Sequence, residues 1–146
     1  MLKGIPKILS PELLKVLAEM GHSDRLVLSD GNFPAESMGK NAIVIRCDGH
    51  GIPELLDAIL QVFPLDTYVD HPVNLMEVMP GDDVETPIWD TYKEIIRNYD
   101  ERGDAVVGSM ERFAFYEEAK KVYAIVATGE SALYANIMLQ KGVVTD

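Results

Sequence analysis

The chain has 146 residues, of which 47% are hydrophobic and 25% are charged, and its formal net charge is −11. This length and composition predict one globular domain that spans residues 1–146. The acidic balance disfavours nucleic acid and anionic membranes as partners, because both attract Lys and Arg. It also argues weakly against a phosphorylated substrate, whereas a neutral substrate is indifferent to the field.

Two further absences in the sequence bear on where the protein acts. Cys47 is the only cysteine, so no internal disulfide can form, which fits a reducing compartment. The amino terminus lacks a long apolar signal-peptide segment, and no apolar run approaches the roughly 18 residues that a membrane span needs. The expected location is therefore the cytoplasm.

Residues 1–46 are predicted to form one helix and two strands. The helix begins at Pro11 and ends before Gly21, because Ser10 can cap it, proline favours the first helical position and glycine ends helices. A buried strand at 25–29, a loop at 30–39 and a second strand at 42–46 follow.

The rest of the chain continues this alternation. Pro53 starts a second helix that Pro64 stops, and Thr86-Pro87 opens a third. Ser109 is expected to cap a fourth helix. Further strands are expected at 74–79, 105–108, 122–128 and 136–140. The alternation predicts a layered α/β fold with a largely parallel sheet, in which 122–128 is a central strand covered on both faces.

His22 and Asp30 are the first candidates for chemistry. His22 follows Gly21 at a helix carboxyl end, where exposed carbonyl groups favour the charged imidazole. Asp24 is close in sequence, and Asp30 follows a strand, which is where sites of α/β folds form. Alternatively, His22 is a helix cap and Asp30 starts a turn. His50 and His71 are expected in exposed loops.

No spacing in the chain is typical of a metal centre. There is no His pair at i, i+4 with a third ligand, and Cys47 has no CxxC partner, so a bound metal is not expected. Asp82 and Asp83 could act as the paired carboxylates of a glycoside hydrolase. Adjacent residues in a Pro-Gly turn usually point apart, however, so a solvated turn is the preferred interpretation.

The carboxyl-terminal third carries a guanidinium, a phenol and an amide. Arg112 at a helix start opposes the macrodipole, and such a conflict with a local rule points to function. Alternatively, Glu117 and Glu118 simply balance its charge. Tyr134 and Asn136 are two residues apart, so in an extended segment both point to one face and can bracket a pair of sugar hydroxyls. The alternative for Tyr134 is a buried ring with a solvated hydroxyl.

Six segments together resemble the D-ribose pyranase/L-fucose mutarotase (RbsD/FucU-like) family over about residues 2–143. They are Gly21-His22-x-Asp24, Ser29-Asp30, Phe33-Pro34-Ala35 with Ser37-Met38-Gly39, Arg112-Phe113-Ala114-Phe115-Tyr116-Glu117, Thr128-Gly129-Glu130 and Tyr134-x-Asn136. The Phe-Pro-Ala and Arg-Phe-Ala-Phe-Tyr-Glu segments are more similar to the fucose branch. Ala135 departs from it, since fucose-type members carry Gly there and the ribose branch carries Ala.

The resemblance implies an RbsD-like three-layer α/β sandwich with a mixed, largely parallel central sheet. It also implies an isomerase that interconverts sugar anomers without a cofactor, in a decamer of two pentameric rings with sites at subunit contacts. His22 would be the acid/base residue. Sugar-binding residues would be Asp30, Arg112, Tyr116, Tyr134, Ala135 and Asn136. Asp30 could orient a hydroxyl or His22 itself, and Tyr134 could relay a second proton.

L-Fucose is the first expectation for the substrate, and D-ribose or another monosaccharide is the alternative within the same chemistry. Two other classes stay open. A non-catalytic sugar-binding or transport-accessory protein would keep the hydroxyl-binding residues without proton transfer, and a scaffold would have ring assembly as its function.

Overall fold

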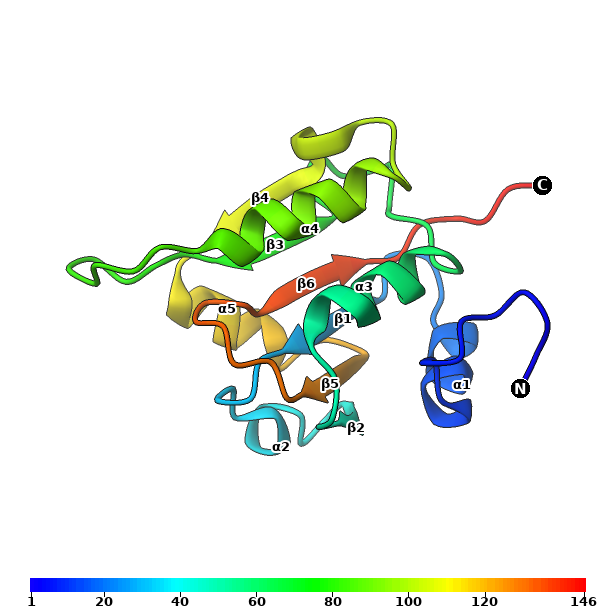
Figure 1. Ribbon diagram of the computed structural model, residues 1–146, viewed down its shortest axis with the longest axis horizontal. Coiled ribbons are helices and arrows are strands. Elements are labelled where there is room, and N and C mark those ends of the chain that lie inside the picture. Colours follow the sequence, from blue (N-terminus) through cyan, green and yellow to red (C-terminus); the bar gives the residue numbers. More distant parts are fainter.

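A single six-stranded sheet organises the protein, and the computed structural model describes all residues 1–146 (Figure 1). The strands are β1 (Arg25–Ser29), β2 (Ile43–Cys47), β3 (Val73–Met76), β4 (Val107–Met110), β5 (Ala124–Thr128) and β6 (Ile137–Gln140). The helices are α1 (Pro11–Glu19), α2 (Ala35–Met38), α3 (Ile52–Leu60), α4 (Pro87–Arg97), the 3₁₀ turn η1 (Gly103–Val106) and α5 (Arg112–Ala119).

The sheet is mixed and mostly parallel, as the resemblance implied. Its order is β2-β5-β1-β6-β3-β4. β5 pairs in parallel with β1 and β2, and β3 pairs in parallel with β4. Only β6 is antiparallel to its neighbours, β1 and β3. Because β6 runs opposite to β1, its first residues lie beside the last residues of β1, which brings Asn136 to Asp30.

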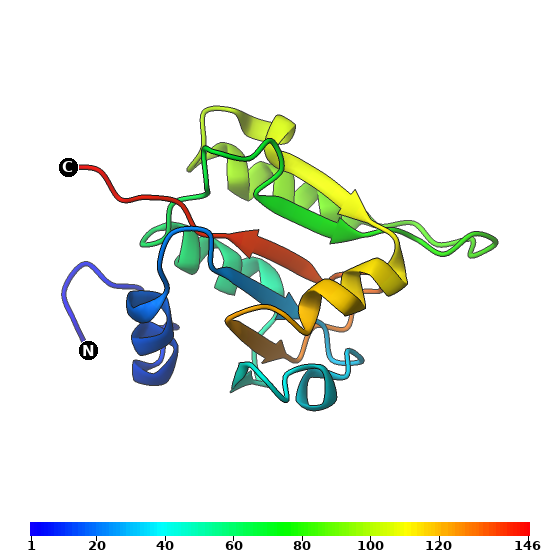
Figure 2. The same ribbon diagram turned by 180° about the vertical axis from the view of Figure 1, so that it is seen from behind.

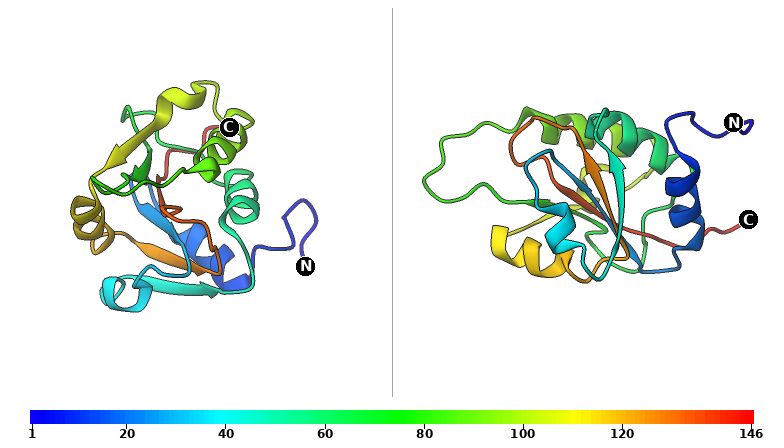
Figure 3. Two further views of the ribbon diagram at one scale, coloured as in Figure 1. Left: turned by 60° about the vertical axis from the view of Figure 1, so that its left-hand side comes forward. Right: turned by 90° about the horizontal axis from the view of Figure 1, so that it is seen from below.

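Helices cover both faces of the sheet and make the third layer. Along β1, Leu26 and Leu28 join the larger hydrophobic core under α1, α3 and α4, whereas Val27 joins the smaller core under α2 and α5. This alternation follows from the two-residue period of a strand. Figure 2 shows α5 on the face opposite α3 and α4, and Figure 3 shows the sheet between the two helical layers. No helix has the length and hydropathy needed to cross a membrane.

Most predicted elements are confirmed, with two differences of physical interest. Ser10 caps α1 as expected, with its Oγ accepting a hydrogen bond from the Leu13 amide at 3.2 Å. The loop at 30–39 contains α2, which at four residues is too short for a helical period to reveal. Ser109 does not cap α5, because it lies within β4; Glu111 caps the helix through the amides of Phe113 and Ala114.

Gly129 lets the segment after β5 pass directly against the β2–α3 loop. A Cβ atom at this position would collide with the carbonyl oxygen of Asp48. The close approach allows Glu130 to accept a hydrogen bond from the Ile52 amide at 3.0 Å, at the start of α3. The loop that leads to Tyr134 is therefore held at the end of the sheet where β1 and β5 terminate.

Candidate functional site

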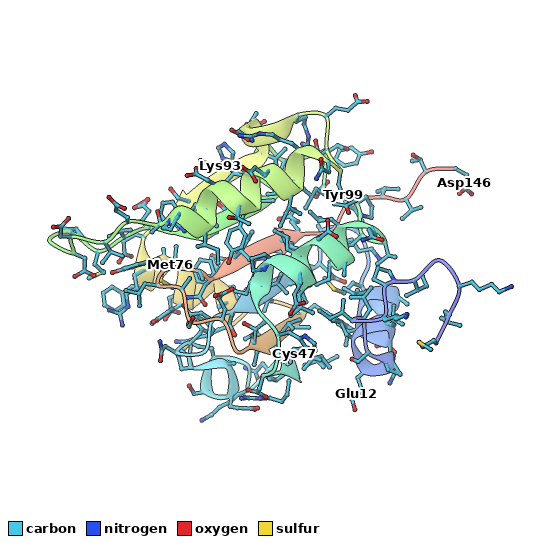
Figure 4. The ribbon with its side chains drawn as sticks, viewed as in Figure 1. Glu12, Cys47, Met76, Lys93, Tyr99 and Asp146 are labelled. Carbon is cyan, nitrogen blue, oxygen red and sulfur yellow. The ribbon has the colours of Figure 1, made fainter.

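A cavity of about 480 Å³ opens at the carboxyl end of β1. Its lining residues come from segments far apart in the sequence: Asp30, Asn32, Phe33, Met76, Asp82, Val84, Arg112, Tyr116, Leu133, Tyr134 and Asn136. Met76 belongs to the end of β3 (Figure 4), and the β3–α4 loop that projects beyond the sheet in Figure 1 contributes Asp82 and Val84. The volume is in the range of small-molecule sites, roughly 300–1,000 Å³.

Asp30 lies at the base of this cavity and is 8% exposed. Its Oδ1 accepts the Asn32 amide at 3.0 Å. Burial raises the pKa of Asp30, and backbone hydrogen bonds from Asn32, Phe33 and Ala135 only partly oppose that effect. The charge of Glu130 raises the pKa further. The carboxyl group of Asp30 is thus fixed in orientation, and it can accept a hydrogen bond from a bound hydroxyl or share a proton with it.

Asn136 is fixed against Asp30 from the neighbouring strand. Its Oδ1 accepts the backbone amide of Asp30 at 2.8 Å, and the residue is 4% exposed. With Oδ1 engaged, the Nδ2 group is the part of this amide left to donate to a ligand. Asp30 and Asn136 together offer an acceptor and a donor on the same wall of the cavity.

Tyr134 adopts a left-handed backbone conformation, with φ of 55°, which is uncommon for a bulky residue. Two residues of α4 hold this turn: Trp89 donates its indole Nε1–H to the Tyr134 carbonyl at 2.8 Å, and Tyr92 donates its hydroxyl to the Ala135 carbonyl at 2.6 Å. The helix therefore stabilises the conformation that directs the phenol into the cavity.

The Tyr134 hydroxyl is bound on its outer side by the projecting loop. It donates to Asp82 Oδ2 and accepts the Met79 amide at 3.2 Å. The hydrogen bond to Asp82 raises the pKa of Tyr134. Asp82 was expected to be a solvated turn residue, and that interpretation was incomplete, because its carboxylate lines the cavity. No local pattern could reveal this, since the two residues are 52 positions apart.

The argument that placed Tyr134 and Asn136 together was wrong, although both do line the cavity. Residues 134–136 precede β6 and are not extended, so strand alternation does not align the two side chains. Ala135 lies between them with its side chain fully buried in the core and away from the cavity wall. A side-chain contact from Ala135 to a ligand is therefore not supported, and only its backbone faces Asp30.

Arg112 and Tyr116, one turn apart on α5, also line the cavity. The guanidinium lies over the Tyr116 ring at 5.4 Å, and its Nε donates to the Tyr116 hydroxyl at 3.4 Å. Phe33 packs edge-on against the same ring, at 5.4 Å between centroids. Glu111 satisfies the helix start, which offsets the local cost of a cation there. The arginine predicted to be functional does face the cavity.

His22 lies at the other end of the sheet and does not reach the cavity of its own chain. It precedes β1, whereas Asp30 follows it, and five strand residues span about 16 Å. Its Nε2 is 3.0 Å from Asp66 Oδ1. The expectation that Asp30 could orient His22 is wrong within one chain. His50 is confirmed as an exposed loop residue, 3.1 Å from Glu54, and His71 is exposed as well.

Comparison with known proteins gives one consistent result. Residues 3–144 match the model of the RbsD / FucU transport protein family. The chain is 53% identical to the fucose mutarotase of Danio rerio, over 98% of this chain and 94% of that protein. The FucU structure from Bifidobacterium longum is 68% identical, with a TM-score of 0.97, and covers 98% of this chain and 100% of that one. The Streptococcus pneumoniae fucose mutarotase in complex with L-fucose is 52% identical, with a TM-score of 0.91, over 99% and 100%.

Proposed function

This chain belongs to the RbsD/FucU family, and we infer from that membership and from its cavity that it is an L-fucose mutarotase. The observation that carries this conclusion is the convergence of Asp30, Arg112, Tyr134 and Asn136 on one cavity. These groups supply donors and acceptors for a neutral polyol, and the adjoining Phe33 and Tyr116 rings suit the apolar face of a deoxysugar.

Mutarotation needs two proton transfers. A base removes the proton of the anomeric hydroxyl while an acid protonates the ring oxygen, so that the ring opens to the aldehyde. Rotation about the bond to the aldehyde carbon and closure on its other face give the second anomer. A positioned acid/base group contributes about 10²- to 10⁴-fold, which suffices for a reaction that already proceeds in water. We assign the base role to His22 and the role of acid at the ring oxygen to Tyr134.

The separation of His22 from the cavity leads us to propose that each site is completed by a second copy of the chain. His22 is 43% exposed, and Tyr68 beside it is 77% exposed. At the cavity end, Phe113 and Leu133 are 59% and 55% exposed. Apolar side chains at both ends of the sheet suit a head-to-tail contact, and head-to-tail contacts close into rings. This supports a ring with sites at subunit contacts, and the decamer of two pentameric rings stays what the family resemblance implies.

Proton-NMR saturation transfer between the anomeric resonances of L-fucose tests the assigned function directly. Added protein should accelerate transfer in proportion to its concentration, and D-ribose and the epimers of fucose should respond less. A stronger response to D-ribose would identify a ribose pyranase instead, the branch that this chain resembles only at Ala135. Stabilisation by L-fucose without acceleration would identify a non-catalytic sugar-binding protein. The cavity of a single chain, which His22 does not reach, is consistent with that alternative.

Replacing Arg112 should weaken sugar binding. In Arg112→Ala, the half-saturating L-fucose concentration should rise about 10- to 150-fold, because a charge-assisted hydrogen bond of roughly 1.5–3 kcal/mol is lost. The exchange rate at saturation should change much less. Arg46→Ala is the matched control, since Arg46 is an exposed arginine outside the cavity. An unchanged half-saturating concentration in Arg112→Ala would remove this residue from the binding site.

The cytoplasm is the location we propose for this activity. The free thiol of Cys47 is compatible with a reducing compartment.

A further inference from the structure

Asp66 is a buried carboxylate that contacts the side chain of His22. Asp66 is 1% exposed, and its Oδ1 is 3.0 Å from His22 Nε2. The same oxygen accepts the Tyr68 amide at 3.0 Å, while Oδ2 accepts Gln140 Nε2 at 2.9 Å. The carboxyl group is therefore fixed in orientation by two partners that are independent of the histidine.

These partners also settle the charge of Asp66. Burial by itself would raise the pKa of Asp66, but hydrogen bonds from the Tyr68 amide, Gln140 and His22 outweigh it and lower the pKa. Asp66 is ionised at neutral pH, and an ionised carboxylate only accepts hydrogen bonds. The ring nitrogen facing it must then carry a proton, and in a neutral imidazole the other nitrogen, Nδ1, holds the lone pair.

We propose that Asp66 is a positioning residue that holds His22 as its Nε2–H tautomer, so that Nδ1 is the nitrogen that exchanges protons with the sugar. This rests on the proposed mutarotase function. The Tyr68 ring, with its centroid 5.0 Å from that of His22, packs on the imidazole and restricts its rotation. With 43% of the His22 side chain exposed, the ring remains accessible to a molecule that docks at this end of the sheet.

The proton steps balance with this assignment. On ring opening, Nδ1 takes the proton of the anomeric hydroxyl, the electron pair of that O–H bond forms the carbonyl, and the bond from the anomeric carbon to the ring oxygen breaks. The ring oxygen takes the proton of Tyr134. On closure both protons return. In the open-chain state His22 is an imidazolium, and the negative charge of Asp66 against Nε2–H stabilises it.

The tautomer can be read from the protein without sugar. In a ¹⁵N NMR spectrum of the ring-labelled protein at a pH where His22 is neutral, Nε2 should show the shift of a protonated nitrogen and Nδ1 that of a lone-pair nitrogen. His22→Ala identifies the signals among the three histidines. The Nδ1–H pattern would overturn the proposal whatever the protein catalyses. Absence of exchange activity in the wild type would instead contradict the function.

Kinetics of Asp66→Asn give the second measurement. The exchange rate at saturating L-fucose should fall at least about tenfold, since the charge that stabilises the imidazolium is lost while the side-chain shape is kept. The dissociation constant for L-fucose should change less than about twofold, because Asp66 does not line the cavity. Asp104→Asn, in an exposed ion pair with Arg97, is the control. An unchanged rate in folded Asp66→Asn would refute the positioning role, and if this variant does not fold, the wild-type spectrum decides.

Discussion

His22→Ala is expected to lower the protein-dependent rate of L-fucose anomer exchange by about 10²- to 10⁴-fold, the range that a positioned acid/base group supplies. Binding of L-fucose should persist, because the residues that line the cavity are untouched. Stability should change little, since His22 is partly exposed and water can replace its bond to Asp66. Saturation transfer gives the rate, and titration monitored by thermal unfolding gives the binding.

The matched control is His50→Ala, which removes an exposed histidine whose partner is also a carboxylate, that of Glu54. This variant should exchange fucose anomers at the wild-type rate. If folded His22→Ala kept the full rate, His22 would be only a helix-end residue bound to Asp66, and proton transfer would have to be assigned to the cavity carboxyl groups.

Two inactive variants should restore activity when they are assembled together. His22→Ala keeps the cavity residues, and Asp30→Asn keeps the histidine of the other sheet end. If each site combines these ends from neighbouring copies, random co-assembly should recover about a quarter of the wild-type rate, because one site in four receives both intact residues. Co-expression with two affinity tags and tandem purification, followed by saturation transfer, measures the recovery.

A second mixture of variants serves as a control, and its activity should not be restored. His22 and Asp66 lie at the same end of the sheet, so a mixture of His22→Ala and Asp66→Asn gives no site with both residues intact. The rate of that mixture should equal the mean of the two separate rates. A failure of the first mixture to exceed its own mean would show that the site does not combine His22 and Asp30 from different copies.

The sequence carries enough information for the fold because its signals are local. The cap at Ser10, the prolines that open α3 and α4, and the continuous apolar run that became β5 each depend on a few neighbouring residues. Predicted element boundaries were wrong where a partner distant in sequence determines the structure. Ser109 pairs with β3 in the sheet, so Glu111 caps α5 instead.

The membership of the cavity was predictable in part, since His22 and Ala135 do not line it and Asp82 was missed, and its geometry was not predictable. Asp30, Arg112, Tyr116, Tyr134 and Asn136 all line the cavity. Their arrangement depends on contacts that sequence spacing does not encode, such as the bond between the Asp30 amide and Asn136, which are 106 positions apart.

The placement of His22 failed for a similar reason. Proximity in sequence to Asp30 suggested a shared site. However, β1 runs between the two residues, so His22 and Asp30, eight positions apart, lie at opposite ends of this strand. The actual partner, Asp66, is 44 positions away. Asp82 escaped notice because only the folded β3–α4 loop brings its carboxylate to Tyr134.

Trp89 has a consequence beyond holding the Tyr134 turn. It is the only tryptophan in the chain, and its indole N–H is bonded to the carbonyl of a residue whose phenol lines the cavity. Indole emission is sensitive to hydrogen bonding and to the polarity around the ring. The protein therefore carries one intrinsic fluorophore, hydrogen-bonded to a segment that lines the cavity, so its ultraviolet emission reports on that segment without any label.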